Sequence, residues 1–194
     1  MTYDDVPGLV EERQAHRETT IVVERERLLD AARHLRDEGG FNFLADVTSV
    51  DYLGWDRSVV AGYWGSPAPT ESGRGWAPPA RDLNAPFPGS QGLQKLPQPK
   101  PKRFAVSYHL LALAPDPRRV RLQVWADEGE PVASVVGIWP TADWFEREMW
   151  DLMGVAIEGH PNLERIIMSE DWEGHPLRKD YPLGGEPVRF SEEE

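Results

Sequence analysis

The sequence predicts an α+β domain in which one sheet is combined with helices. Several short segments are rich in β-branched residues, two others show helical periodicity, and both kinds alternate within 194 residues. A chain of this length fits one compact domain and can bury a core without disulfides. The sequence contains no cysteine, which excludes disulfides, a thiol nucleophile and iron–sulfur ligation by this chain.

The N-terminal part predicts a strand, a helix and a second strand. Residues 20–24 are short and β-branched, which is typical of a strand. Residues 25–38 carry apolar side chains at helical spacing, and two glycines follow as a stop signal: Leu28, Leu29, Ala32, Leu35, Gly39 and Gly40. Residues 41–53 predict a half-buried strand, because Phe43, Ala45 and Val47 alternate with polar neighbours.

The middle of the chain predicts a long loop followed by two strands. Residues 65–101 contain nine of the eighteen prolines and five glycines, so an irregular insertion between two halves of the sheet is expected. Residues 104–113 and 120–125 predict strands joined by a turn at 114–118. In the second of these strands, three apolar side chains point to one face: Val120, Leu122 and Val124.

Residues 142–153 predict a helix with Gly154 as its C-terminal stop, after a short apolar stretch at 134–139. Asp143 and Glu146 have the spacing of a capping box. The expected apolar stripe consists of Phe145, Met149, Leu152 and Met153, whereas Asp143, Arg147 and Asp151 lie four apart on another face and can form weak pairs.

The net charge of −12 argues against nucleic acid and anionic lipid as direct ligands. The charge is uneven, because residues 141–194 carry 14 acidic and 5 basic side chains, whereas residues 64–140 carry 6 acidic and 9 basic ones. The acidic C-terminal third is therefore expected to face a basic protein surface. No secretory signal and no apolar run long enough to cross a bilayer is recognisable, so membrane contact is expected only through a partner.

Two Gly-His-Pro triplets, at 159–161 and 174–176, leave two explanations open. They can supply His160 and His175 to a metal, with Asp171, Glu173 or Asp180 as further ligands. They can also form tight turns in which each histidine bonds to nearby backbone, and this explanation is favoured because the spacing matches no standard zinc pattern. Ser169 lies in no nucleophile motif, and no phosphate-binding glycine loop is present.

The acidic side chains of the predicted helix, Glu146, Glu148 and Asp151, permit three roles: acid–base catalysis, a solvated face or a protein contact. Trp150 beside Arg147 is the strongest single candidate for an interface anchor, because tryptophan and arginine dominate interfaces. The basic run at 95–103 is better explained as a stiff linker than as a docking peptide.

Two long blocks carry a family resemblance. The first runs from Glu146-Arg147-Glu148 through Asp151-Leu152-Met153 and His160 to Ile167, and the second is the continuous run from Glu170 to Leu183. Together they resemble the 30-kilodalton subunit family of respiratory complex I, whose members are the C subunits of NADH-quinone oxidoreductase. The segments 41–53 and 103–111 are also similar to that family, so the resemblance covers about residues 20–183. Glu164 departs from the pattern, which usually has a basic residue or proline there.

The resemblance implies an α+β fold with a small, mostly antiparallel sheet and flanking helices. It implies a subunit of the hydrophilic arm of NADH:quinone oxidoreductase, peripheral on the cytoplasmic side of the cell membrane, that holds no catalytic, metal or cofactor site; NADH, flavin, iron–sulfur clusters and quinone would belong to partner subunits. The implied neighbours are the 49-kilodalton-like subunit and the subunit that bears the terminal cluster. Residues 1–158 would form the domain, with the 65–101 insertion, and residues 159–194 an extended interaction segment.

The side chains expected at subunit interfaces lie in the two blocks: Glu146, Arg147, Trp150, Asp151, His160, His175, Arg178, Lys179, Asp180 and Tyr181. Three other interpretations stay open. The chain can belong to a related membrane-bound hydrogenase or a ferredoxin-fed relative, it can be a free-standing metal enzyme that uses His160 and His175, or it can be an adaptor unrelated to respiration.

Overall fold

The computed structural model describes residues 3–55, 99–113 and 116–182. The described residues up to Leu53 and from Pro101 onward belong to one compact unit. In the second unit, Gly54–Lys100, the ammonium group of Lys100 lies 5.7 Å from the centre of the Trp55 ring. Most of the predicted 65–101 loop falls outside the described residues.

The main sheet has five strands in the order β1-β2-β5-β4-β3. Its strands are β1 (Leu9–Ala15), β2 (Glu18–Val23), β3 (Phe43–Asp51), β4 (Phe104–Ala112) and β5 (Arg118–Ala126). All neighbouring pairs are antiparallel except β2 with β5, which is parallel. A second sheet pairs β6 (Val132–Ala133) with β7 (Ile157–Glu158). The predicted α+β class with a mostly antiparallel sheet is confirmed.

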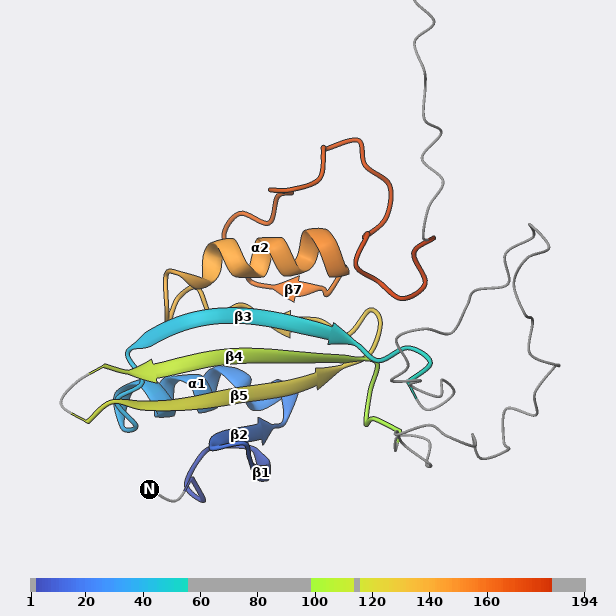
Figure 1. Cartoon of the computed structure of the whole chain (residues 1–194). Coiled ribbons are helices and arrows are strands. Elements are labelled where there is room, and N and C mark those ends of the chain that lie inside the picture. Colours follow the sequence, from blue (N-terminus) through green and yellow to red (C-terminus); the bar gives the residue numbers. More distant parts are fainter. Residues whose placement is uncertain (1–2, 56–98, 114–115, 183–194) are drawn as a thin grey trace, which may run out of the picture. The chain divides into compact units, whose positions relative to one another are not determined.

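Among the described residues, a short 3-10 helix and two α-helices accompany the sheet. The short η1 (Arg25–Arg27) leads into α1 (Leu28–Asp37), and α2 (Ala142–Met153) runs along β3 (Figure 1). Both predicted helices are confirmed, and α2 has the predicted bounds. Gly154 ends α2 in the left-handed conformation at φ +68°, which glycine adopts without the strain of a side chain.

One predicted strand has a different pattern of burial. In β3, Leu44 and Val47 are buried whereas Phe43 is exposed, so the expected alternation of Phe43, Ala45 and Val47 is wrong. The reason is an irregularity in the pairing of β3 with β4 between Leu44 and Asp46, because an extra residue at a bulge reverses which side chains face the core.

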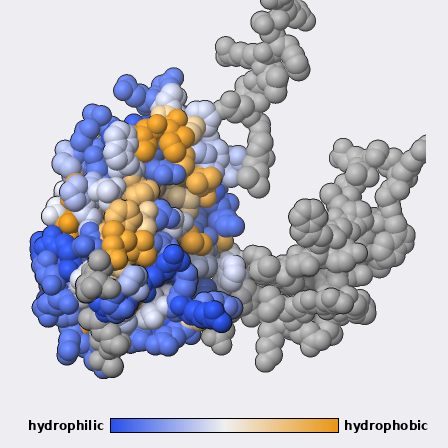
Figure 2. All heavy atoms as spheres, turned by 60° about the vertical axis from the view of Figure 1, so that its left-hand side comes forward, coloured by the Kyte–Doolittle hydropathy of each residue, from blue (hydrophilic) through white to orange (hydrophobic). Residues whose placement is uncertain are grey.

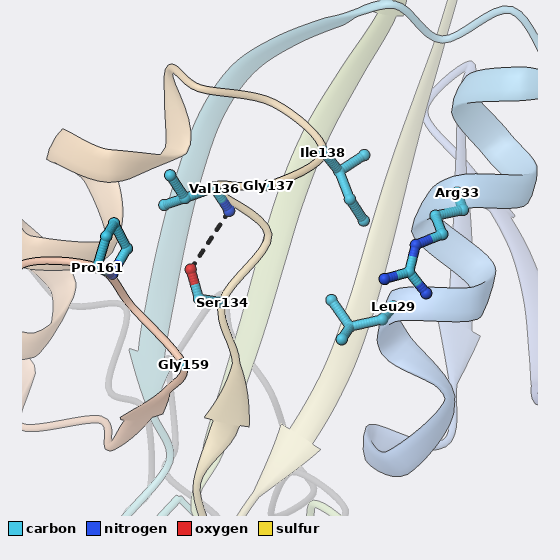
Figure 3. A pocket seen from close by; sticks show the side chains of 8 residues that line it. All are labelled: Leu29, Arg33, Ser134, Val136, Gly137, Ile138, Gly159 and Pro161. Atoms are coloured by element: carbon cyan, nitrogen blue, oxygen red, sulfur yellow. Dashed lines mark hydrogen bonds between the residues drawn. The ribbon is translucent and has the colours of Figure 1, made fainter.

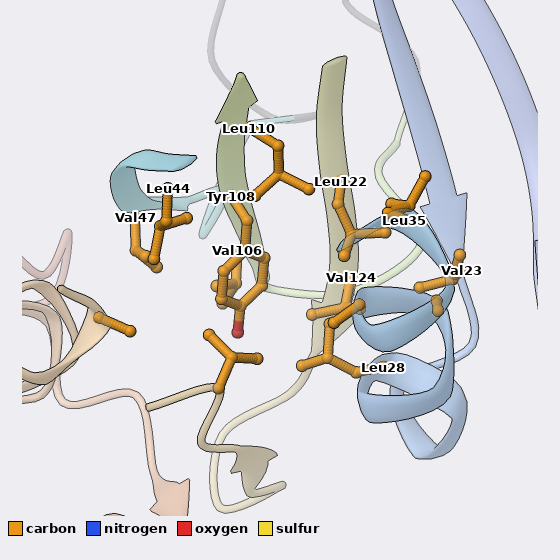
Figure 4. Close-up of a cluster of buried hydrophobic side chains, with 14 of the residues drawn as sticks. Val23, Leu28, Leu35, Leu44, Val47, Val106, Tyr108, Leu110, Leu122 and Val124 are labelled. Atoms are coloured by element: carbon orange, nitrogen blue, oxygen red, sulfur yellow. The ribbon is translucent and has the colours of Figure 1, made fainter. Parts of the chain in front are cut away.

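The core lies on the face of the sheet that α1 and α2 cover. Figure 4 shows side chains of β4 and β5 meeting those of α1, with the Tyr108 hydroxyl pointing away from the sheet. Val120, Leu122 and Val124 are all buried, which confirms their predicted common face. Each such side chain contributes about 1.5–3 kcal/mol of transfer free energy on burial.

Candidate functional site

The first sequence block lies on α2 and the loops around it, and two of its carboxylates are inside the domain. Glu146 and Asp151 are both 0% exposed, so the expectation that they form interface contacts or a charged helix face is corrected. The capping box is also wrong, because Thr141 precedes the helix without a side-chain cap. Glu146 Oε1 instead accepts a hydrogen bond from the Val135 amide at 2.7 Å.

Asp151 binds the chain segment that follows α2. Its Oδ2 atom accepts hydrogen bonds from three consecutive backbone amides, those of Ile166, Ile167 and Met168, at 3.1, 2.8 and 2.9 Å. Its Oδ1 atom lies 2.6 Å from Nη1 of Arg165. Burial acts to raise the pKa of Asp151, but these amides and Arg165 outweigh it, and the pKa lies below its ordinary value. Asp151 is therefore an ionised anchor for a loop.

A second buried carboxylate, Asp51 at the end of β3, holds the segment farther along. Arg103 makes a two-bond contact to it, with Nε at 3.0 Å from Oδ1 and Nη2 at 2.8 Å from Oδ2. The Lys179 amide donates to the same carboxylate at 2.9 Å. Burial acts to raise the pKa of Asp51, yet Arg103 and the Lys179 amide leave it below the ordinary value.

Arg178 and Asp180 extend this network at the surface. Asp180 lies 2.9 Å from Nε of Arg178 and 2.9 Å from Nη2 of Arg103, and both guanidinium groups also reach Glu128. Arg178 first, and Arg103 second, hold the pKa of Asp180 far below its usual range. Arg178 and Asp180 were expected to contact a partner subunit, but their charges are paired within the chain.

The two histidines lie at opposite ends of α2. His160 Nε2 is 3.3 Å from the Asp143 carbonyl oxygen, whereas His175 Nδ1 is 2.9 Å from the carbonyl oxygen of Asp151. Eight helical residues separate these carbonyls, which corresponds to about 12 Å along the axis. The structure therefore holds the two imidazoles on different turns of α2 rather than together at one metal site. Within the described residues, no group of three potential ligands is suitably placed either.

Each Gly-His-Pro triplet forms a turn that fits the alternative explanation. Gly159 and Gly174 both have positive φ, at +77° and +87°. His160 Nδ1 accepts the Asn162 amide at 3.1 Å. The His175 ring packs so closely on Gly154 that an added Cβ there would lie 2.5 Å from it.

The remaining predicted anchors are partly used within the chain. The Arg147 guanidinium lies 5.1 Å from the centre of the Trp144 ring, and its Nε donates to the Glu164 carbonyl oxygen at 3.1 Å. Trp150 is half-buried, with the Arg165 guanidinium 5.7 Å from its ring centre. Tyr181 is half-buried too, and its ring would meet a Cβ at Gly174.

These contacts correct the picture of an extended segment after residue 158. Up to residue 182 the segment is fastened to its own domain by Asp151, by Asp51 and by the Leu177 amide, which donates to the Leu152 carbonyl oxygen at 2.9 Å. Residues 183–194 lie outside the described part, so their role as an interaction segment stays a prediction. Lys179 keeps an exposed side chain, although its amide is engaged.

Large apolar residues remain exposed at this surface, and the sequence-based prediction, which relied on charge, missed them. Trp144 is 61%, Ile167 55% and Leu177 58% exposed. Exposed acidic residues of the same segment accompany them: Glu148, Glu164, Glu170, Asp171 and Glu173. Figure 2 shows apolar surface gathered in separate areas among hydrophilic surface on one face. The signal in the sequence that could have identified these residues was the presence of large apolar side chains within a charge-rich segment.

A groove of about 430 Å³ lies between α1 and the loop that follows β6. Figure 3 shows Leu29 and Arg33 on α1 facing Ile138, whereas the Val136 side chain points toward the side on which Pro161 lies. The hydroxyl of Ser134 accepts the Val136 amide at 3.3 Å, and the lining includes neither a carboxylate nor a histidine. The lining residues therefore supply no acid–base pair.

Fold and site together define a class of protein: a small α+β domain in which a charged motif fastens the following segment back onto the sheet and leaves apolar and acidic groups exposed. A family model described as respiratory-chain NADH dehydrogenase, 30 Kd subunit, matches residues 81–187. The NADH-quinone oxidoreductase C subunit of Citrifermentans bemidjiense is 36% identical over 169 residues, which cover 87% of this chain and 76% of that protein. The corresponding C subunit of Roseiflexus sp. is 38% identical over 175 residues, covering 89% and 74%. The chain belongs to the family of the 30-kilodalton subunit of respiratory-chain NADH dehydrogenase.

The fold is shared with solved structures, among them the following two. A trypsin-resistant fragment of Nqo5 matches with a TM-score of 0.52 and 28% identity, over 79% of this chain and 87% of that one. A chain of the archaeal membrane-bound sulfane sulfur reductase matches with a TM-score of 0.59 at 17% identity, over 93% and 81%, which is a likeness of fold alone. No described helix of the present chain is long and apolar enough to span a membrane.

Proposed function

We propose that this chain is a scaffold subunit in the hydrophilic arm of a proton-translocating NADH:quinone oxidoreductase. It would hold no cofactor and would support electron transfer from NADH through iron–sulfur clusters to quinone by positioning its neighbours. Membership of the 30-kilodalton subunit family carries this proposal. The site supports it, because the charged side chains of the two blocks stabilise a defined surface rather than line the groove.

The contact surface we propose is centred on the segment fastened around the C-terminal end of α2. The Ile167 amide is the middle one of the three that donate to Asp151, and Leu177 is joined through its amide to the end of the helix. Exposed apolar side chains held on rigid backbone lose little conformational freedom when they bind. The acidic residues around them suit basic surfaces on the 49-kilodalton-like subunit and the terminal-cluster subunit. The complex would place the chain peripherally at the cytoplasmic side of the membrane.

Affinity purification of the complete complex through this chain tests the proposal. The wild-type chain is expected to bring down the 49-kilodalton-like and terminal-cluster subunits together with NADH dehydrogenase activity. Leu177→Glu is expected to reduce their recovery, because it places a charge in an apolar contact. The matched control is Val10→Glu, since Val10 is 63% exposed on β1, at the opposite edge of the sheet from β3. Recovery of the chain without either neighbour would contradict the proposal.

The alternative of a hydrogenase-like or ferredoxin-fed complex differs only in the electron donor. The archaeal match reflects fold alone and does not favour this alternative. Oxidation of NADH, and no oxidation of reduced ferredoxin, by the purified complex is the expected outcome. The reverse preference would move the chain to the related complexes.

A further inference from the structure

Trp144 and Arg147 form a stacked pair in the N-terminal half of α2. They are three positions apart, so their side chains lie on the same side of the helix. The guanidinium carbon of Arg147 lies 5.1 Å from the centre of the Trp144 ring, within the range of a cation–π contact, and Trp144 is 61% exposed. The contact surface around Leu177, in contrast, is joined to the end of the helix at Leu152.

Arg147 is held in place without an ion pair. Its Nε atom donates to the Glu164 carbonyl oxygen at 3.1 Å, which leaves Nη1 and Nη2 without a hydrogen bond among the described residues. In the parts of the chain that the structure describes, every arginine except Arg17 and Arg147 forms an ion pair. Arg17 is exposed in the turn between β1 and β2, whereas Arg147 is half-buried. Arg147 is therefore a partly desolvated cation in a fixed position, and the described residues offer it no anionic partner.

The acidic residues beside Arg147 do not supply this partner. Glu164 contacts Arg147 through its backbone carbonyl, and its carboxylate lies 3.4 Å from the side-chain amide nitrogen of Asn162. Glu148 is the next residue along the helix, where consecutive side chains point to different sides. We therefore expect the carboxylate that pairs with Arg147 to come from another chain.

We propose that Trp144 and Arg147 bind an acidic segment of a partner subunit, in which a carboxylate accepts the two free Nη groups and an apolar surface receives the indole ring. The guanidinium fork bonds a carboxylate through two parallel hydrogen bonds, and tryptophan and arginine are the residues that dominate interface energies. Because the two side chains already hold each other, they lose little conformational freedom on binding.

Charge complementarity distinguishes this site from the surface around Leu177. The segment that carries Leu177 has exposed acidic side chains, which suit a basic surface, whereas the free guanidinium of Arg147 suits an acidic one. Helix α2 thus connects the domain to partner surfaces of opposite charge. This assignment rests on the proposed function, because it requires a complex of subunits.

Competition for assembly tests the site in the complete complex. Wild-type chain and variant are produced together with different tags, the complex is purified through its 49-kilodalton-like subunit, and mass spectrometry gives the ratio of the two chains. Trp144→Ala and Arg147→Gln are each expected to lower the variant-to-wild-type ratio by about tenfold, as for anchor residues of an interface. Both changes are at the surface of the domain, so the isolated variants are expected to melt within about 3 °C of the wild-type chain.

The matched control is Arg17→Gln, because Arg17 is the other described arginine without an ion pair. It is expected to be incorporated as efficiently as the wild-type chain. Equal incorporation of Trp144→Ala, Arg147→Gln and wild type would show that the pair binds no partner, although the proposed function would stand. Absence of the wild-type chain itself from the purified complex would contradict the proposed function and this site together.

A cross-link identifies the chemistry of the partner without removing either side chain. The chain contains no cysteine, so Glu148→Cys provides a single attachment point for a photoreactive group beside Arg147. The cross-linked peptide is expected to come from a partner subunit and to contain aspartate or glutamate. Arg147→Glu should then be excluded from the complex, and a lysine in place of the partner's acidic residue should restore its incorporation. Cross-linking only to lipid or to a peptide without an acidic residue, or no restoration by the charge reversal, overturns the proposal.

Discussion

Replacing Asp151 with asparagine changes one atom of a fully buried side chain and removes its charge. In the native chain one oxygen accepts three backbone amides and the other binds Arg165. An asparagine side chain has one oxygen and one NH₂ group. If its oxygen faces the amides, Arg165 loses its anionic partner; if it faces Arg165, three amides lose their acceptor.

The size of the effect follows from this conflict. Removing one partner of a buried ion pair costs about 3–5 kcal/mol, because the remaining charge is left uncompensated. The Arg165 side chain is 15% exposed, so solvent only partly compensates for its lost partner. For a chain of this size each kcal/mol lowers the melting temperature by about 3 °C, and Asp151→Asn is therefore expected to lower it by about 9–15 °C.

Calorimetry of the full chain measures the global effect, and amide hydrogen exchange at residues 166–168 measures the local one. Asp171→Asn is the control, because Asp171 lies in the same segment with an exposed side chain. The control is expected to melt like wild type. If Asp151→Asn also melts like wild type and keeps slow exchange at 166–168, then Asp151 does not anchor the segment and the reasoning fails.

Other predictions concern the turns and the second anchor. Gly154→Ala is expected to lower the free energy of unfolding, measured in urea, more than Gly159→Ala does. Both positions have positive φ, but only Gly154 packs against the His175 ring. Gly159→Ala should lower the free energy of unfolding by about 1 kcal/mol. Equal losses would show that the ring contact is unimportant. Arg103→Lys keeps the charge but loses the two-bond contact to Asp51, so a loss of about 1–3 kcal/mol is expected in the same assay. Because the folded pKa of Asp51 is depressed, its stabilisation is present above the unfolded pKa of about 4 and is lost as the pH falls through the folded pKa. In an acid titration Arg103→Lys should therefore lose less stability than wild type, and a steeper loss would contradict this.

The elements with strong local signals could be predicted from the sequence. Helix α2 combines apolar periodicity with Gly154 at its end, and both its bounds are confirmed. The signal for the burial of Glu146 was also present, since its position follows Ala142 by four residues and precedes Met149 by three, on the same buried face. The prediction gave more weight to the charge of Glu146 than to its position on this face.

Other features depend on contacts that no local pattern reveals. Strand β1 is exposed on both faces and joins β2 through His16 and Arg17, which have φ of 53° and 66°, so neither alternation nor a turn-forming glycine marks the hairpin. Asp151 lies outside the apolar stripe of α2 and is buried only because the segment at 166–168 folds over it. The bulge in β3 likewise depends on its pairing with β4.

The two buried carboxylates of α2 differ in environment, and this difference explains their separate roles. Asp151 has three amides and a guanidinium group and remains ionised near the C-terminal end of the helix, where Arg165 offsets the unfavourable helix dipole. Glu146 accepts one backbone amide, and burial raises its pKa against the lowering effects of Ser134, the Val135 amide and His160. Both carboxyl groups hold other segments of the chain through hydrogen bonds, so their variants should lower the stability of the fold before they affect assembly. Assembly variants belong instead at exposed apolar positions such as Leu177, where the folded domain has no internal use for the side chain.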